Sequence, residues 1–526
     1  MTRVALPPEA ITAPGGRCAE PDGKEGDEIM WYDDKIGMDK PYKLYIGGRF
    51  TESAAGETFD FINPATGKAF GKGYFGRIPD MEAAIRAARD AFDNGPWGKM
   101  SGAERGRLIA KAGDVLARRA EEFAIVETLD AGKQYMSALY YEVPQSIDAF
   151  HFYAHKARTL SGESSRMDGN YLNYVDWYPC GVVGEILPWN GPLMMGSQKI
   201  GAILAAGNTV IVKPPQWASA SMLLLAEVFD EAGFPPGVVN VVTGSGGEVG
   251  QELVRSPLVD MVSMTGGTET GRSVLENSAG TVKTLALELG GKSPNIIFDD
   301  VEIKNAAKWA VHGFTLHSGQ VCVSGTRIFA QRGIYEEFLE EMKNVCASFI
   351  PGNGFDYEKG VNFSSLIHPE HAAKVWDYIK DGNEAGARLV CGGVPYEDPQ
   401  LACGSFVPPT IFADVTPEMR IFKDEIFGPV ACVTPFGDEE EALALANRTD
   451  YGLAGAVFSN NVKRALRVAQ GIKAGQIYVN TYFSKGMIDS PAAGWKQSGV
   501  GVAGIRKYMV SKTVFVDLND VSEPPM

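Results

Sequence analysis

The sequence GVVGEILPWNGPLMMGSQKIGAILAAGNTVIVKP, residues 181–214, repeats one structural pattern. A short apolar and β-branched run over 181–187 predicts a strand, and the next apolar positions predict a helix over 192–206. A second strand-like run covers 208–214. Strands that alternate with helices are typical of βαβ units in a parallel sheet. Two further strand-like runs, each followed by a helical pattern, cover residues 238–244 and 261–266.

The same alternation is found on both sides of this stretch. Before it, Gly47-Gly48 predicts a hairpin turn, and Asp80 is expected to cap a helix over 80–92. Longer helical patterns cover 104–134 and 136–160. After residue 290 the strand-like runs are SPNIIFD, TRIFAQ, ARLVCGG, CVTPF, GAVFS and GQIYVN. The sequence therefore predicts an α/β protein with two lobes.

The composition limits the class of partner. The 526 residues include 49 Lys and Arg against 65 Asp and Glu, so the net charge is −16. Phosphate backbones require a basic surface, which argues against nucleic acid as the main partner. No apolar run approaches 18 residues, so no membrane-spanning helix is expected. Residues 1–41 are rich in Pro, Gly and acidic residues and predict an irregular N-terminal arm.

The cysteines indicate a reducing compartment. The chain has seven, which is an odd number, and no CxxC pair occurs. This pattern predicts reduced thiols and, with an N-terminus that lacks a secretory signal pattern, a cytoplasmic location. A metal site is not expected, because His151 and His155 lack the Glu of the HExxH zinc motif.

Cys322 is the first candidate for chemistry. It lies in HSGQVCVSGTR between two Val residues, and such a cysteine is most often an inert part of a core. However, Gly319 and Gly325 allow a ligand to approach the backbone closely. Ser324-Gly325 would suit a helix or turn start that lowers the thiol pKa. The residue is therefore also a candidate nucleophile.

Glu288 and Asn190 follow predicted strands. Glu288 comes after an apolar run and before Gly290-Gly291, and a carboxylate in an apolar setting has a raised pKa that suits a general base. Alternatively, Glu288 is a solvent-exposed residue at the end of a strand with no catalytic role. Asn190 follows the strand over 181–187, where ligands of α/β proteins bind, and its amide could donate to an oxyanion. Alternatively, the Asn190 side chain caps the helix that follows it.

Two glycine-rich turns lie between a strand and a helix. GSGGEVG carries Gly246 and Gly250, and TGGTETG carries Gly266, Gly267 and Gly271. Backbone N–H groups in such turns can bind phosphate, and two in successive βα units favour a dinucleotide cofactor.

Together and in this order, these segments resemble the aldehyde dehydrogenase superfamily over roughly residues 42–520. The resemblance rests on PWNGPL, AAGNTVIVKP, TGGTETG, LELGGKSPN, GQVC, EIFGPV and SGVG. The separation of 34 residues between Glu288 and Cys322 (322 − 288) fits that of base and nucleophile in the family.

The resemblance implies roles for individual residues. Cys322 matches the nucleophile, Glu288 the general base, Asn190 the oxyanion amide and Lys199 a lysine of the proton relay. Lys213 matches the lysine at the adenosine ribose, and Glu425 and Phe427 match the pair at the nicotinamide ribose and ring. The cofactor, NAD or NADP, is expected to contact Ile186, Leu187, Pro188, Trp189, Lys213, Gln216, Gly246, Gly250, Gly266, Gly267, Gly271, Leu289, Glu425 and Phe427.

The resemblance also implies an architecture. A Rossmann-like cofactor domain would comprise 42–160 and 181–289, and an α/β catalytic domain 290–496. A β-flap for oligomerisation would comprise 161–180 and 505–520. A homodimer or homotetramer is expected, because the flap strand has an exposed edge.

The sequence departs from the family pattern around the substrate and the cofactor. Gly191, Gln198 and Ala492 stand where aromatic residues are common, so the resemblance predicts a wide pocket for a bulky, aromatic or long-chain aldehyde. Gln216 stands where a Glu is common, which predicts tolerance of NADP. Val502-Ala503 stands where Arg-Glu is common and leaves the partner of Lys199 open. The substrate pocket is expected to comprise Gly191, Met195, Gln198, Val321, Val323 and Ala492.

The expected activity is oxidation of an aldehyde to a carboxylic acid, through a thiohemiacetal and a thioester on Cys322. Two alternatives are a CoA-acylating semialdehyde dehydrogenase and a non-catalytic binding protein with this fold. Glu288 argues against the first, because those family members usually lack this base. The presence of all three candidate catalytic residues argues against the second.

Overall fold

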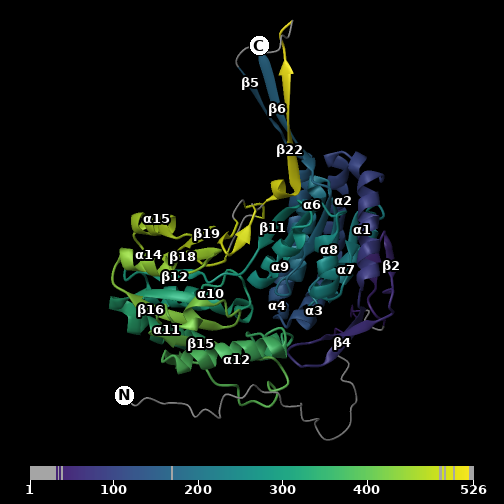
Figure 1. Cartoon of the computed structure of the whole chain (residues 1–526). Helices are drawn as coiled ribbons and strands as arrows, with labels where there is room; N and C mark the ends of the chain where they lie inside the picture. The colour runs from purple at the N-terminus through teal and green to yellow at the C-terminus, as the bar shows by residue number, and fades with distance from the viewer. Residues whose placement is uncertain are drawn as a thin grey trace, which may run out of the picture.

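The computed structural model describes residues 31–32, 35–36, 40–167, 170–484, 488–490, 493–501 and 504–520. Two α/β lobes lie side by side, and a narrow three-stranded sheet projects from one of them (Figure 1). This agrees with the predicted fold class. The domain boundaries drawn from the sequence remain predictions.

The first lobe is built on an eight-stranded sheet with the order β2-β1-β9-β8-β7-β10-β11-β21. The strands β9, β8, β7, β10 and β11 are parallel, and β1 and β21 pair antiparallel at either side of them. The bounds are β1 Leu44–Ile46, β2 Arg49–Thr51, β7 Val182–Ile186, β8 Thr209–Lys213, β9 Val239–Val241, β10 Met261–Thr265, β11 Thr284–Glu288 and β21 Gly499–Val500.

Helices cover both faces of this sheet because both faces of its strands are apolar. Val210 and Val212 pack into one core with α2, α5, α6 and α7, whereas Ile211 between them packs into another with α1 and α8. The bounds are α1 Ile78–Asp93, α2 Gly102–Arg118, α3 Ala120–Ala131, α4 Tyr135–Ser137, η4 Ala138–Glu142, α5 Val143–Arg158, α6 Pro192–Ala206, α7 Ala220–Ala232, η5 Gly246–Gly250, α8 Gln251–Arg255 and α9 Thr268–Ser278.

The second lobe is built on a seven-stranded sheet with the order β14-β15-β16-β13-β12-β18-β19, parallel except for β14. Its strands are β12 Pro294–Ile297, β13 Arg327–Gln331, β14 Arg388–Cys391, β15 Thr410–Ala413, β16 Val430–Phe436, β18 Ala454–Phe458 and β19 Gln476–Val479. Its helices are α10 Ile303–Thr315, η6 Leu316–Gly319, α11 Tyr335–Cys346, α12 Pro369–Glu384, α13 Arg420–Lys423, α14 Glu439–Asn447 and α15 Val462–Gly471.

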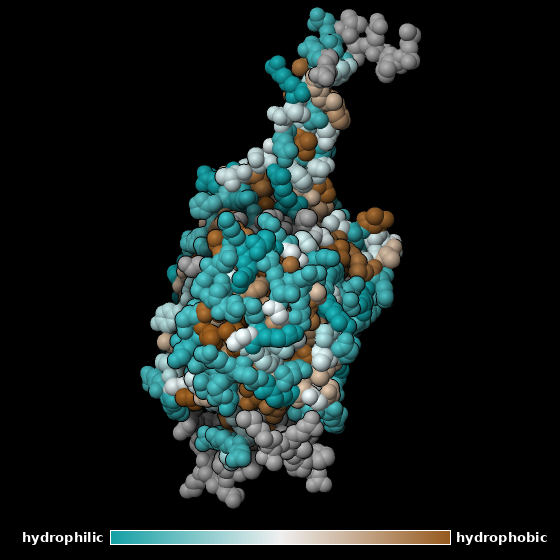
Figure 2. Space-filling model, turned by 90° about the vertical axis from the view of Figure 1, so that its left-hand side faces the viewer, coloured by the Kyte–Doolittle hydropathy of each residue, from teal (hydrophilic) through white to brown (hydrophobic). Residues whose placement is uncertain are grey.

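The projecting sheet consists of β5 Glu163–Met167, β6 Tyr171–Pro179 and β22 Met509–Asp517, in the order β22-β6-β5. Strand β22 pairs with β6 along its whole length, from Met509 opposite Pro179 to Asp517 opposite Tyr171. Figure 2 shows that this sheet extends away from the body of the molecule and carries apolar side chains among polar ones. In a single chain it has little to pack against.

Several local expectations need correction. The helix α6 has the predicted bounds, but the long patterns over 104–134 and 136–160 divide into α2, α3, α4, η4 and α5. Asp80 does not cap α1; it is the third residue of the helix, and its carboxylate accepts from the N–H of Arg77, the N-cap residue (2.8 Å). An N3 carboxylate bonded in this way satisfies the N–H of the N-cap residue, whereas an N-cap side chain would satisfy an N–H within the first turn.

Two further findings concern the N-terminal arm and the cysteines. Within the predicted arm, Tyr32 and Ile36 are buried in the core of the first lobe, and Tyr32 stacks on Phe355 with 4.3 Å between ring centroids. Cys403 is disulfide-bonded, so the prediction of reduced thiols fails there. No described helix is long and apolar enough to span a membrane.

Candidate active site

The carboxyl ends of the parallel strands bring distant residues together. Ile186 at the end of β7 lies opposite Lys213 on β8 and Met264 on β10, and Thr265 lies opposite Glu288 on β11. The chain runs from β7 outward through β8 and β9, then returns to the other side of β7 as β10. Such a reversal of strand order creates a crevice where α/β proteins bind ligands.

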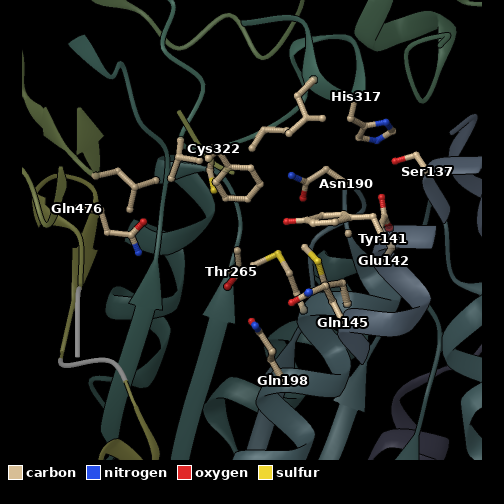
Figure 3. A pocket seen from close by; sticks show the side chains of 18 of the residues that line it. Ser137, Tyr141, Glu142, Gln145, Asn190, Gln198, Thr265, His317, Cys322 and Gln476 are labelled. Atoms are coloured by element: carbon tan, nitrogen blue, oxygen red, sulfur yellow. The ribbon is translucent and has the colours of Figure 1, made fainter. Parts of the chain in front are cut away.

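A cavity of about 720 Å³ lies between the two lobes at this edge. Asn190 and Lys199 line it from the first lobe, and Cys322 lines it from the turn before β13 of the second. Figure 3 shows Asn190, Thr265 and Cys322 around the same space. Glu288 lines the cavity as well. The structure therefore brings together all four residues that the sequence predicts to be catalytic.

The turn that carries Cys322 does not begin a helix. Residues 321–326 form a turn and extended backbone before β13. Burial, followed by the Glu425 and Glu288 carboxylates, raises the pKa of the Cys322 thiol to about 12. The expectation of a helix or turn start that lowers this pKa is thus wrong, because negative groups and low polarity favour the neutral thiol.

Asn190 is positioned by the same turn. Its Nδ2 donates to the carbonyl oxygen of Gln320 (2.8 Å), and the Gln320 side chain accepts from the N–H of Ile367 (2.9 Å). An amide nitrogen carries two hydrogens, so one remains for a ligand in the cavity. The alternative reading of Asn190 as a helix cap is not supported, because α6 has Gly191 as its N-cap residue with no side-chain cap.

Glu288 lies between two lysines. Its Oε1 is 3.4 Å from Lys199 Nζ and 3.1 Å from Lys507 Nζ. Burial alone would raise its pKa, but the two ammonium groups outweigh burial and lower the pKa to about 2. The predicted raised pKa is therefore wrong. The side chain keeps 34% of its surface exposed to the cavity, so the carboxylate is accessible to a ligand.

Glu185 is a second carboxylate beside Lys199, on the side of the core. It lies on β7, is fully buried, and places Oε1 3.7 Å from Lys199 Nζ. Burial raises the pKa of Glu185 to about 7, although Lys199 opposes the change. Sequence reasoning missed Glu185 and Lys507. The Glu185 signal was present, because a lone acid within an apolar strand requires a buried partner, but nothing in the sequence around Lys507 indicated its contact with Glu288.

Two of the glycines predicted for the cofactor site have open space beside their backbone. An added Cβ at Gly246 or Gly267 would meet nothing within 4 Å, whereas Gly271 has no room because Leu289 packs against it. Lys213 is buried, which lowers its pKa to about 8, and Gln216 three residues later is exposed. Open backbone turns at a helix start beside a lysine fit the phosphates of a dinucleotide.

The nicotinamide end of the predicted cofactor site is made by the second lobe. Glu425 accepts from the N–H of Gly291 (3.0 Å), and burial raises the pKa of Glu425 to about 7. The Phe427 ring lies edge-on to Trp189 with centroids 5.1 Å apart, and its carbonyl oxygen lies 2.7 Å from Nε2 of His371. His371 was missed by sequence reasoning, since it is distant in the chain.

The predicted walls of the substrate pocket line the cavity, except that Ala492 lies outside the described residues. These walls are Gly191, Met195, Gln198, Val321 and Val323. Polar residues from α4, η4 and α5 also line the cavity and were not predicted. Figure 3 shows them together with His317; they are Ser137, Tyr141, Glu142 and Gln145.

Among the described residues, no group of three or more His, Cys, Asp or Glu side chains could hold a metal ion. Of the candidate pair, His155 uses Nδ1 to contact the carbonyl oxygen of His151 (2.8 Å).

Comparison with known proteins identifies the family. The model of the aldehyde dehydrogenase family matches residues 50–514. The chain belongs to the aldehyde dehydrogenase family. It is 39% identical over 494 residues to an aldehyde dehydrogenase of Emericella nidulans, covering 92% of this chain and 97% of that one. It is 38% identical over 483 residues to the cytosolic aldehyde dehydrogenase 1 of rat, with 91% and 95% covered.

Solved structures of the family share the fold. The NAD⁺ complex of an aldehyde dehydrogenase from Bacillus cereus has a TM-score of 0.88 and 38% identity, and the match covers 92% of this chain and 98% of that one. The protein is thus an oxidoreductase of the NAD(P)-dependent aldehyde dehydrogenase type.

Proposed function

We propose that this aldehyde dehydrogenase oxidises a bulky aldehyde to the free carboxylic acid, with Cys322 as nucleophile. The observation that carries the proposal is the presence of Cys322, Asn190 and Glu288 around one cavity at the carboxyl edge of the first sheet. A thiol, an amide donor and a carboxylate are the groups that acyl chemistry through a thioester requires.

In the first step the Cys322 sulfur bonds to the aldehyde carbon, and the C=O π electrons move to the oxygen. The product is a tetrahedral thiohemiacetal, whose oxyanion accepts from the free hydrogen of the Asn190 amide. Removal of one oxyanion donor typically costs about 3–4 kcal/mol. Because burial raises the pKa of Cys322 to about 12, the thiol proton must pass to a base as the bond forms. A water molecule in the cavity is the acceptor that we propose for this proton, and Glu288 acts as the base in the later hydrolysis.

The bound nicotinamide cofactor supplies the acceptor for the hydride that leaves the thiohemiacetal carbon. The chain is left with a thioester on Cys322. Glu288 then removes a proton from a water molecule, and the hydroxide displaces sulfur to give the carboxylic acid and free Cys322.

Protons collected by Glu288 need an exit. Lys199 and Lys507 lie within 3.4 Å of its carboxylate, and Glu185 lies behind Lys199. We propose that Glu185 takes the place of the missing relay partner of Lys199. Its pKa of about 7 allows it to accept or release a proton near neutral pH.

We propose that NAD and NADP both bind. Lys213 and Gln216 are the residues that would meet the adenosine ribose, and Gln216 brings no negative charge to repel a 2′-phosphate. The Bacillus cereus relative binds NAD⁺, which supports the NAD half of the proposal.

The substrate class follows from the size of the cavity. About 720 Å³ of space and the small Gly191 favour an aromatic or long-chain aldehyde over acetaldehyde, by graded steps of about 1–3 kcal/mol per methylene.

We also propose a homodimer or homotetramer joined through the projecting sheet, and a cytoplasmic location, which a relative named cytosolic supports. The disulfide at Cys403 weighs against that location.

One experiment separates this function from its alternatives. NAD(P)H absorbance is followed with acetaldehyde, benzaldehyde and octanal, with and without CoA. We expect oxidation without CoA and a higher kcat/KM for the larger aldehydes. A requirement for CoA would favour the acylating alternative, and no reduction with any aldehyde would favour a binding protein.

A further inference from the structure

His317 is held in a strained backbone conformation at the wall of the cavity. His317 and Ser318 have φ values of 48° and 54°, in the left-handed region that costs free energy for residues other than Gly. The Ser318 hydroxyl donates to the carbonyl oxygen of Ser364 (2.6 Å), and the Gln320 amide donates to that of His317 (3.1 Å). The surrounding chain therefore fixes where the imidazole points.

The imidazole has no partner within the described residues. Both ring nitrogens are buried and neither makes a hydrogen bond. Burial, together with the nearby Lys133 ammonium, lowers the pKa of His317 well below 6.5, so the ring is neutral. A neutral imidazole has one N–H donor and one acceptor nitrogen. A buried polar group without partners is costly unless a ligand satisfies it.

The side chains around His317 favour a neutral ligand group over an anion. Lys133 is already paired with Glu127 (2.6 Å) and with Glu142, so its charge is not available to an anion. Ser137 lies on the same side of the cavity as His317, away from Gln476 (Figure 3). A π-helical turn, η4, precedes α5 and brings Glu142 to the cavity, and such turns are frequent at functional sites.

We propose that His317, with Ser137, binds a hydroxyl group at the end of the substrate opposite the aldehyde. A hydroxyl both donates and accepts, so it can pair with one ring nitrogen of the neutral imidazole in either tautomer. This inference rests on the proposed function, because it concerns the same cavity. It narrows the substrate class from a bulky aldehyde to a bulky hydroxylated one.

The test compares aldehydes of nearly equal size. One pair is 4-hydroxybenzaldehyde and 4-methylbenzaldehyde; a second, longer pair is 4-(hydroxymethyl)benzaldehyde and 4-ethylbenzaldehyde. In at least one pair we expect kcat/KM to be about tenfold or more higher for the hydroxylated aldehyde, mainly through KM, because the contact is made before and during the reaction.

Three variants test whether the preference for the hydroxylated aldehyde depends on the His317 side chain. In His317→Leu we expect the preference to fall several-fold towards unity, and in His317→Gln, which keeps a donor and an acceptor, to be largely retained. His155→Leu, at an exposed histidine outside the cavity, serves as the matched control and keeps the preference. If His317→Leu does not fold, the wild-type pairs and His317→Gln still test the inference.

Two outcomes would overturn the inference while leaving the proposed function intact. One is equal kcat/KM for both members of each pair in the wild type. The other is an unchanged preference in His317→Leu. Failure to oxidise any of the four aldehydes would instead contradict the proposed function.

Discussion

Glu185→Gln should make the stability of the protein less dependent on pH. Glu185 is fully buried, and its pKa is raised from 4.5 to about 7, first by burial. Because the folded-state pKa is the raised one, protonated Glu185 stabilises the fold fully below about pH 4.5. This stabilisation is lost as the pH rises to about 7. Gln at this position keeps the shape and cannot ionise.

The magnitude follows from the two pKa values. Between pH 5 and pH 7 the unfolded chain has released this proton and the folded chain has not, so the wild type loses about 1.4 kcal/mol per pH unit. Relative to Glu185→Gln, the loss between pH 5 and pH 8 is about 3 kcal/mol. For a lobe of this size, in which about 1 kcal/mol shifts Tm by about 2–4 °C, it corresponds to a change of about 6–12 °C in the Tm difference.

The assay is thermal unfolding of both proteins at pH 5 and pH 8 at one scan rate. Neighbouring groups should not obscure the result: the pKa of Glu288 is lowered to about 2, and those of Lys199 and Tyr508 are raised. All three keep one charge state over this range. A Tm difference that is the same at both pH values would show that Glu185 does not titrate with a raised pKa.

Three further predictions concern the nucleophile, the cofactor and the assembly. Cys322→Ala should abolish aldehyde oxidation and keep cofactor binding, measured by NADH fluorescence titration; appreciable NADH production would contradict it. Gln216→Glu should lower kcat/KM with NADP about tenfold more than with NAD, since a close like-charge contact costs about 1–4 kcal/mol; an unchanged ratio would show that Gln216 does not face the ribose. Light scattering at micromolar concentration should give a dimer or tetramer, and a species of 56.6 kDa alone would argue against assembly through the projecting sheet.

The sequence was most informative where local patterns decide the structure. The bounds of α6 and the alternation of strands and helices in both lobes follow from apolar spacing and β-branched runs. The position of Glu288 and Asn190 at strand ends was predictable for the same reason, because parallel strands present their carboxyl ends at one edge.

The electrostatics of the site were not predictable in this way. The pKa of Glu288 depends on Lys507, which is 219 residues away in the chain. The pKa of Cys322 depends on burial and then on Glu425, which is distant in the chain although it belongs to the same lobe. The polar wall that contains His317 and Ser137 combines residues from both lobes. Long-range contacts of this kind carry no local sequence signal.

Rapid mixing of Glu288→Gln with NAD and benzaldehyde shows whether Glu288 activates the water that hydrolyses the thioester. We expect a burst of about one NADH per active subunit, followed by a slow steady state, with an acyl group on Cys322 detectable by mass spectrometry of the quenched protein. Turnover at the wild-type rate with no burst and no acylated Cys322 would contradict this role of Glu288.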